Sequence, residues 1–152
     1  VFTQAVYALA ERNIPVVVHI ILGLPGESRE TVLRTIDYLN RLPIQGVKLQ
    51  LLHVLSDSDL ADLYRAGEYT PLEKEEYITL VGDCIAHLRA DIVLHRLTGD
   101  GDKNTLLAPL WSLRKRDVLN HLHRYLRENH IRQGMSCKID LSVIYNKPKD
   151  VL

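Results

Sequence analysis

Two periods of apolar residues alternate along this chain. In some segments apolar residues recur every three or four positions, which is typical of a helix with one buried face. These segments span residues 2–12, 28–39, 60–65, 71–88 and 112–130. Between them lie short continuous apolar runs that favour strands, at residues 15–22, 46–55 and 91–97. The pattern predicts the order α-β-α-β-α-β-α, with the two segments after the second strand counted together.

The three predicted strands indicate a parallel sheet. They lack polar alternation, so we expect them to be buried on both faces and joined by helical crossovers. Three strands are too few to complete such a sheet, so we expect an α/β fold in which residues 1–134 form the C-terminal half of a partial (β/α) TIM-type barrel. The missing N-terminal half of the barrel, or a second copy at the exposed sheet edge, would cover the open strand. Residues 135–152 alternate like an exposed strand and are treated as an appended tail of uncertain fold.

Local signals mark two helix starts. Ser28 follows the Gly23–Gly26 turn and is expected to cap the next helix. Thr70, Pro71 and Glu73 have the spacing of a capping box, which predicts a helix that begins at the proline.

Composition is that of an ordinary globular protein. Hydrophobic residues make up 46% of the 152 positions and charged residues 25%, which excludes a disordered chain. No apolar run approaches the roughly 18 to 20 residues that span a bilayer, so no membrane partner is expected. Cys84 and Cys137 are too few for a disulfide framework, so the expected location is cytoplasmic. The chain begins at Val1 without a leader pattern, and we expect it to be part of a longer protein.

Equal numbers of acidic and basic side chains, 19 each, conceal a gradient along the chain. Residues 1–88 carry 7 basic and 12 acidic side chains, whereas residues 89–132 carry 9 and 5. Most of the later basic residues lie in or beside the last predicted helix: Arg114, Lys115, Arg116, Arg124, Arg127 and Arg132. This helix could hold an RNA backbone or a protein partner, or it could be an ordinary solvated helix.

Function in parallel α/β proteins lies in the loops at the carboxyl ends of the strands. Here these loops are Gly23–Ser28, His53–Asp59 and Arg96–Asp102. The glycines of the first loop would let backbone N–H groups approach an anionic ligand, or would simply form a tight turn. The other two loops carry D-x-D spacings that a divalent metal could use, but this spacing recurs by chance, so no metal ligand is expected in this chain.

Five ordered motifs resemble one family of radical S-adenosylmethionine (SAM) proteins. They are HIILGLPGES at 19–28, GVKLQLLHVL at 46–55, HRLTGDG at 95–101, APLWS at 108–112 and VLN at 118–120. The first is similar to the fifth-strand segment of the Elongator-type and coproporphyrinogen oxidase-like enzymes. The whole series looks like the uncharacterised bacterial YtqA/YhcC type, from about residue 1 to Gly134.

The resemblance implies a radical SAM enzyme in which an iron–sulfur [4Fe–4S] cluster, bound by C-x3-C-x2-C, cleaves SAM to start radical chemistry on an unknown substrate. That motif is absent here, because Cys84 and Cys137 are 53 positions apart. The chain would supply part of the SAM pocket and the substrate-side loops, and alone is expected not to catalyse the reaction. The alternative is a non-catalytic binding module that uses the basic helix; an unrelated barrel enzyme lacks a recognisable nucleophile–base pair.

The resemblance also assigns residues that would contact SAM: Gly23, Leu24, Pro25, Gly26, Leu51, Leu52 and His53. Polar residues on the strands and at their ends are candidates for the substrate cavity: His19, Lys48, His95, Arg96, Asp100 and Asp102. Alternation places Lys48 and Gln50 on one face of their strand and His53 on the other. Of His95 and Arg96, one should face the barrel interior, although both could reach the rim at the strand end. Lys48 and Arg96 could form a structural salt link with an aspartate or bind an anion.

Overall fold

The computed structural model describes residues 1–99, 101–139 and 144. The helices are α1 (Phe2–Ala10), α2 (Arg29–Leu39), α3 (Asp59–Arg65), α4 (Lys74–His87), α5 (Lys115–Glu128) and a short 3₁₀ helix, η1 (Leu110–Leu113). The strands are β1 (Val17–Leu22), β2 (Gly46–Leu51), β3 (Val54–Leu55), β4 (Val93–Arg96) and β5 (Leu106–Ala108). Strands and helices alternate largely as the apolar periodicity predicts.

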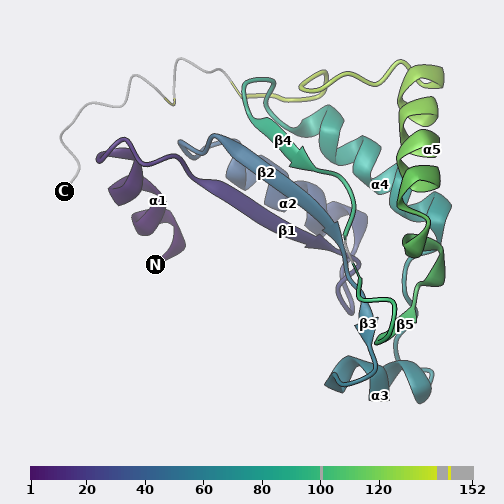
Figure 1. Cartoon of the computed structure of the whole chain (residues 1–152). Helices are drawn as coiled ribbons and strands as arrows, with labels where there is room; N and C mark the ends of the chain where they lie inside the picture. The colour runs from purple at the N-terminus through teal and green to yellow at the C-terminus, as the bar shows by residue number, and fades with distance from the viewer. Residues whose placement is uncertain (100, 140–143, 145–152) are drawn as a thin grey trace.

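Strands β1, β2 and β4 form a parallel sheet with β2 at its centre. β1 pairs with β2 along its whole length, from Val17 opposite Gly46 to Leu22 opposite Leu51. Helices α2 and α4 lie behind the strands in Figure 1, and α5 packs against α4. The prediction of an α/β fold with three parallel strands and helical crossovers is confirmed.

One face of the sheet is covered and the other is open, so the expectation of strands buried on both faces is wrong for the described chain. On the covered face, Val47, Leu49 and Leu51 of β2 are 0%, 0% and 5% exposed. On the other face, Val17 and Ile21 of β1 are 37% and 43% exposed. The cause is that the described helices pack on one side only, so the apolar residues of the second face have no cover within this part of the chain. We call this second face the open face.

The predicted strand at 46–55 is divided in two. β2 ends at Leu51, and β3 pairs antiparallel with β5 in a separate two-stranded sheet. This small sheet and α3 lie together at the lower end of the molecule in Figure 1. A second core cluster of Val54, Ala61, Tyr69 and Ala108 holds them. We call residues 54–69 together with β5 the lower extension.

The helix starts were predicted correctly in one case and wrongly in the other. Ser28 caps α2, because its side chain accepts a hydrogen bond from the backbone N–H of Thr31. Helix α4, in contrast, begins at Lys74 rather than at Pro71. Its capping box uses Glu73 and Glu76, three residues further along the chain than predicted.

A buried arginine joins the chain segments that precede β2 and β4. Arg89 is 1% exposed, and its Nη1 donates to the carbonyl oxygens of Asn40 at 2.7 Å and Leu42 at 3.2 Å. Its Nη2 donates to the carbonyl oxygen of Ile44 at 3.3 Å, and its Nε lies 2.6 Å from a carboxylate oxygen of Asp91. Such a buried cation is tolerated because nearly all of its donors are satisfied. The arginine fixes where the two neighbouring strands begin.

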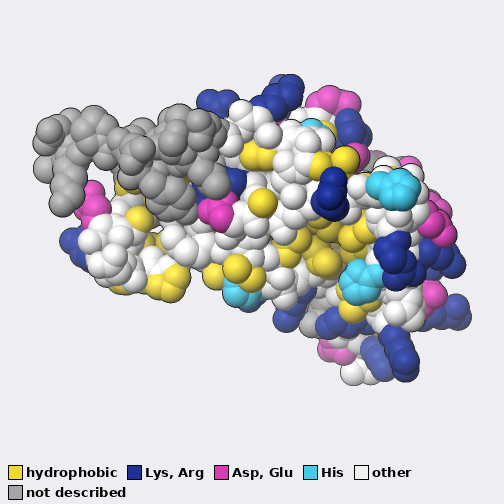
Figure 2. All heavy atoms as spheres, turned by 90° about the horizontal axis from the view of Figure 1, so that it is seen from above, with side chains coloured by type: hydrophobic (Ala, Val, Ile, Leu, Met, Phe, Trp, Pro, Cys, Tyr) yellow, Lys and Arg dark blue, Asp and Glu magenta, His cyan; other side chains and the backbone are white. Residues whose placement is uncertain are grey.

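Basic side chains gather on the outer surface of α5. The exposed ones within and directly beside the helix are Arg114, Lys115, Arg116, His123, Arg124, Arg127, His130 and Arg132. Figure 2 shows Lys, Arg and His side chains concentrated on the side of the molecule where this helix lies. Val118 and Leu122 face inward and are each 1% exposed. This helix therefore has an apolar inner face and a basic outer face.

Candidate functional site

The open face of the parallel sheet carries polar side chains in the middle of apolar ones. Lys48 and Gln50 of β2 are half-buried, and they alternate with core residues as predicted. In the register of the sheet, His19 of β1 lies beside Lys48, and Ile21 lies beside Gln50. Because neighbours in register on a parallel sheet point to the same side, these four residues share the open face.

A register shift changes the face of the residues at the end of β4. Leu94 pairs with Val47, but the next pair along the strands joins Arg96 to Lys48 and passes over His95. Leu94 and Leu97 both pack against the core, three positions apart, so the two residues between them face the other side. Both His95 and Arg96 are therefore on the open face, rather than one of them as simple alternation predicts.

A small cavity lies where the open face reaches the carboxyl ends of β1 and β2. It has a volume of about 180 Å³ and is lined by Ile21, Gln50, Leu51, Leu52, His53 and Gly99. The imidazole of His53 packs closely on the loop after β4, since a Cβ added at Gly99 would lie 2.6 Å from its Cε1 atom. The second strand end and the loop after β4 thus meet at one place, as expected for loops at the carboxyl ends of parallel strands.

The glycine turn after β1 satisfies its own backbone groups. The carboxylate of Glu27 accepts hydrogen bonds from the N–H groups of Gly23 at 3.2 Å and Leu24 at 3.3 Å. The hydroxyl of Tyr69 donates to the carbonyl oxygen of Gly23 at 2.7 Å, and burial raises the pKa of this tyrosine, so the hydroxyl keeps its proton. Because Glu27 already occupies the two amides, this conformation favours the tight-turn interpretation over an anion cradle.

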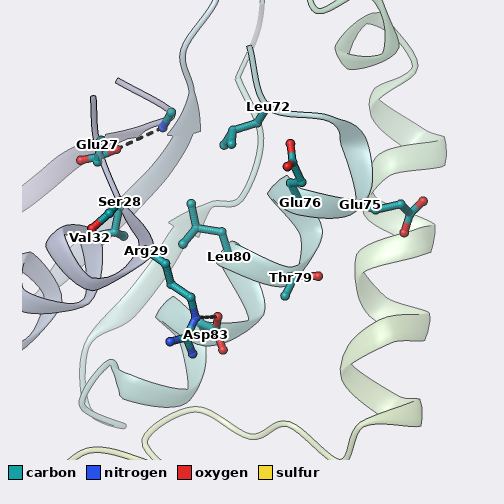
Figure 3. A pocket seen from close by; sticks show the side chains of 11 residues that line it. Glu27, Ser28, Arg29, Val32, Leu72, Glu75, Glu76, Thr79, Leu80 and Asp83 are labelled. Carbon is teal, nitrogen blue, oxygen red and sulfur yellow. Dashed lines mark hydrogen bonds and ion pairs between the residues drawn. The ribbon is translucent and has the colours of Figure 1, made fainter. Parts of the chain in front are cut away.

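A larger cavity, of about 400 Å³, lies on the helix side of this turn between α2 and α4. Figure 3 shows its acidic side chains, and each has a structural role. Asp83 holds Arg29 at 2.6 Å, and Glu76 accepts the backbone N–H of Glu73 in the capping box. Glu75 extends toward α5, where its carboxylate lies 3.2 Å from Nε2 of His121. Of the site residues expected from the sequence, this cavity contacts only Gly23, so we place the candidate site at the smaller cavity.

The structure brings together some of the expected residues and leaves others apart. Leu51, Leu52 and His53 line the small cavity, and His19, Lys48, His95 and Arg96 share the open face next to it. Leu24, Pro25 and Gly26 lie on the exposed outer part of the turn. Asp102 is exposed, and its carboxylate accepts the backbone N–H of Asn104 at 3.0 Å. Asp100 lies outside the described residues, as do Leu141, Val143 and Tyr145 of the predicted tail strand.

Sequence reasoning missed the two side chains that hold the turn in place. Glu27 was read only as part of the loop, although its position four residues after Gly23 is a local signal. Tyr69 comes from the lower extension, and its bond to Gly23 spans 46 positions. No local pattern indicates such a contact.

The two cysteines do not fit an iron–sulfur cluster. Cys84 is buried within α4, and burial raises the pKa of its thiol to about 12, so it does not provide the thiolate that a cluster needs. Cys137 is half-buried, and its sulfur accepts a hydrogen bond from the side-chain amide of Asn40 at 3.6 Å. Within the described residues no group of three or more His, Cys, Asp or Glu side chains could hold a metal ion.

A parallel sheet with helices on one face and a cavity at its strand ends defines an α/β protein whose candidate site lies at the carboxyl ends of its strands. The chain belongs to the Radical_SAM C-terminal domain family, which it matches over residues 44–128. The resemblance found in the motifs is thereby confirmed.

None of the described helices is long and apolar enough to cross a bilayer.

Named relatives support the same family. The chain is 32% identical over 133 residues to the uncharacterized protein YtqA of Bacillus subtilis, and 33% identical over 121 residues to protein YhcC of Escherichia coli K12. These alignments cover 88% and 80% of this chain but only 41% and 39% of the relatives. An uncharacterized archaeal protein, MJ0486 of Methanocaldococcus jannaschii, is 33% identical over 132 residues and is covered to 41%. The chain therefore spans about two fifths of the length of these relatives.

A solved structure has a similar fold. The archaeal Elp3 of Methanocaldococcus infernus, with an N-terminal deletion, superposes with a TM-score of 0.70 at 17% sequence identity. The superposition covers 86% of this chain and 31% of the Elp3 chain. At this identity the likeness concerns the fold alone.

Proposed function

We propose that this chain is the C-terminal part of the catalytic fold of a radical SAM enzyme, and that its strand ends form one wall of the SAM pocket. The observation that carries the proposal is the small cavity at the ends of β1 and β2, in a chain that belongs to the Radical_SAM C-terminal domain family. In such an enzyme a [4Fe–4S] cluster reductively cleaves bound SAM, which starts radical chemistry on the substrate. The cysteines of this chain do not fit that cluster, so its ligands belong to another part of the protein.

The open face supports a barrel in the complete protein. A parallel sheet normally has cover on both faces, and here Val17, Ile21 and Val93 are 37%, 43% and 56% exposed on one side. Additional strands that continue the sheet past β1 or β4 would enclose this face as the interior of a partial (β/α) barrel. The carboxyl ends of the strands would then meet at one rim, where α/β barrels hold their active sites.

The small cavity fits part of a SAM molecule. Its volume of about 180 Å³ is below the roughly 300–1,000 Å³ of typical ligand pockets, so it would hold one moiety rather than the whole ligand. Ile21, Leu51 and Leu52 offer apolar walls for a heterocyclic base, and the amide of Gln50 offers both a donor and an acceptor. His53 closes the side next to Gly99. In the proposed role these residues bind and orient the adenine and exclude water from it.

The test uses the complete protein that contains this chain, purified without oxygen and loaded with its cluster. Equilibrium dialysis measures SAM binding, and chromatography measures release of 5′-deoxyadenosine after reduction. We expect Gly99→Val to weaken SAM binding at least tenfold, because its side chain would clash with the ring of His53, and both residues line the cavity. The control is Ala8→Val, which adds a valine at an exposed position of α1 outside the cavity.

Three results would contradict this proposal. The first is a complete sequence without C-x3-C-x2-C upstream of this chain. The second is wild-type protein that neither binds SAM nor releases 5′-deoxyadenosine. The third is a folded Gly99→Val protein with wild-type SAM affinity. Since Gly99→Val could disturb the loop, Ile21→Trp serves as a second variant, because a tryptophan at this exposed lining position would occupy part of the cavity.

We propose RNA as a partner of the α5 surface, as a second function carried by a separate observation. A cavity of about 530 Å³ at the end of α5 is lined by Leu126, Arg127, His130, Ile131 and Arg132, next to the other basic residues of this surface. Closely spaced cations beside a groove favour a polyanion with regularly spaced phosphates. Binding of this kind would bring a large substrate to the protein without base-specific contacts.

A mobility-shift titration of the complete protein with total tRNA tests this partner. Wild-type affinity should fall steeply with salt, and an Arg124→Gln, Arg127→Gln double variant should bind more weakly with a slope reduced by about 2, one per lost phosphate contact. The control is an Arg34→Gln, Arg41→Gln double variant, which removes the same amount of positive charge from exposed positions on α2 and just after it. Equal affinities of the two double variants, or no shift at low salt, would refute RNA binding by α5 and favour a protein partner or a simply solvated helix.

A further inference from the structure

A row of basic side chains crosses the open face of the sheet, two residues before the pair of Ile21 and Gln50 on β1 and β2. His19 of β1 lies in register with Lys48 of β2, and Lys48 lies in register with Arg96 of β4. With adjacent strands about 4.8 Å apart, the outer Cα atoms of the row are roughly 10 Å from each other. Lys48 is therefore the centre of a compact group to which each strand of the sheet contributes one basic residue.

A fourth basic side chain lies directly next to this row. The ring of His95 covers Gly46, since a Cβ added there would lie 2.5 Å from Nε2 of the histidine. The absence of a side chain at Gly46 is what allows this ring to lie so close to β2. The register shift that turns both His95 and Arg96 to the open face thus brings both basic side chains next to Lys48.

Apart from Gln50 and His95, the neighbours of the row on the open face are apolar, which makes a charge there costly. Val17, Ile21 and Val93 surround it on the open face, where interior positions of α/β barrels usually carry Val, Ile or Leu. Once this face is enclosed, the ammonium group of Lys48 is stable only if an anion compensates it. Lys48 is already half-buried, and its side chain has no ion pair or hydrogen bond with any of the described residues.

We propose that the row of His19, Lys48 and Arg96 binds an anionic oxygen group of the substrate, either a carboxylate or a phosphate. The inference rests on the proposed function, because it needs the open face to be the interior of the complete protein. The row lies about 7 Å along the strands from the layer of Ile21 and Gln50, at a rise of about 3.3 Å per residue. The anionic group is therefore held deeper in the fold than the moiety in the small cavity, and a substrate that reaches it extends past the bound SAM toward the centre of the sheet.

The test measures anion binding directly by calorimetry on the complete protein, with inorganic phosphate in one series and acetate in the other. Wild type should bind at least one of the two saturably. Lys48→Met should weaken this binding at least tenfold, whereas Lys48→Arg should retain it within about threefold because the charge is kept. The matched control is Arg41→Met, which removes one positive charge from an exposed position outside the open face and should change the affinity less than twofold.

The two series separate the sources of the anion. Tighter binding of phosphate indicates a phosphorylated substrate, tighter binding of acetate indicates a carboxylate, and either result supports the row. The inference is overturned if wild type binds neither anion, or if folded Lys48→Met binds them as wild type does. SAM binding by the same wild-type protein is measured separately. Protein that binds SAM but shows no Lys48-dependent anion binding refutes this inference and leaves the proposed function standing, whereas protein that binds no SAM refutes the proposed function.

Discussion

Replacement of the buried Arg89 by methionine should destabilise the protein more than any exposed charge change. The guanidinium donates to three backbone carbonyls, those of Asn40, Leu42 and Ile44, in a site where Arg89 is 1% exposed. Methionine fills much of the same volume but has no donor, so these carbonyls lose a charged partner in a region that water does not reach. A hydrogen bond to a charged group contributes about 1.5–3 kcal/mol, and loss of one partner of a buried ionic group typically costs about 3–5 kcal/mol.

We expect Arg89→Met to lower the free energy of unfolding by about 3–5 kcal/mol. Asp91 adds little to this loss because its side chain is 31% exposed and rehydrates when the arginine is removed. At roughly 2–4 °C per kcal/mol for a chain of this size, the Tm should fall by about 6–20 °C. Thermal unfolding followed by far-ultraviolet circular dichroism measures the change.

Two further variants separate the hydrogen bonds from the charge. Arg89→Lys keeps the charge but cannot reach three carbonyls with one ammonium group, so its stability should lie between those of wild type and Arg89→Met. Arg41→Met removes an exposed arginine and should stay within about 0.5 kcal/mol of wild type. If Arg89→Met also stays within about 0.5 kcal/mol, the arginine does not hold the two strand starts together and the reasoning is wrong.

Three other predictions concern the turn and the thiols. Gly23→Ala should lower the free energy of unfolding in urea more than Gly26→Ala does. Both glycines have a positive φ, at 90° and 72°, so backbone strain costs each variant about 1–2 kcal/mol, but only a Cβ at Gly23 would lie 3.1 Å from Leu72. Equal losses of stability would exclude a contribution from the contact with Leu72. A thiol reagent should modify only Cys137 in the native protein and both cysteines after unfolding, because Cys84 is 0% exposed. A folded Cys137→Ser protein that still reacts with the reagent would contradict the burial of Cys84. Burial raises the pKa of Cys84 from 9.0 to about 12. The neutral thiol therefore contributes stability that is present below about pH 9 and is lost as the pH rises toward 12. Cys84→Ala should flatten this alkaline decline in Tm.

The unit from β1 to α2 was predictable because its signals are local. A β-branched run, a glycine turn and a serine cap follow each other within 12 residues, and each acts on its immediate neighbours. The parallel sheet was predictable for a related reason, since helices between apolar strands leave few other connections. These elements required no knowledge of which segments meet in space.

The boundaries after Leu51 and before Lys74 were not predictable in this way. β3 exists because β5, about 50 positions later, pairs with it, and the sequence 46–55 reads as one continuous strand without that partner. Residues 70–72 have the composition of a helix start, yet in the structure they precede α4 and contact other elements. The indole N–H of Trp111 donates to the carbonyl oxygen of Leu72 at 3.2 Å, and the side chain of Leu72 packs on Gly23. The capping box is formed three residues later instead, by Glu73 and Glu76.

The basic row shows why the candidate site could be predicted as a set of residues but not as an arrangement. Alternation along an isolated strand assigns His95 and Arg96 to opposite faces, and it gives no relation between Arg96 and Lys48. The register shift belongs to the pair of strands β2 and β4, and a shift of one residue reverses the face of every later side chain. Leu94 and Leu97 pack in the same core as a result, and the polar residues between them join Lys48 on the open face. The contacts between strands, rather than the pattern within either one, therefore decide that these charges lie together.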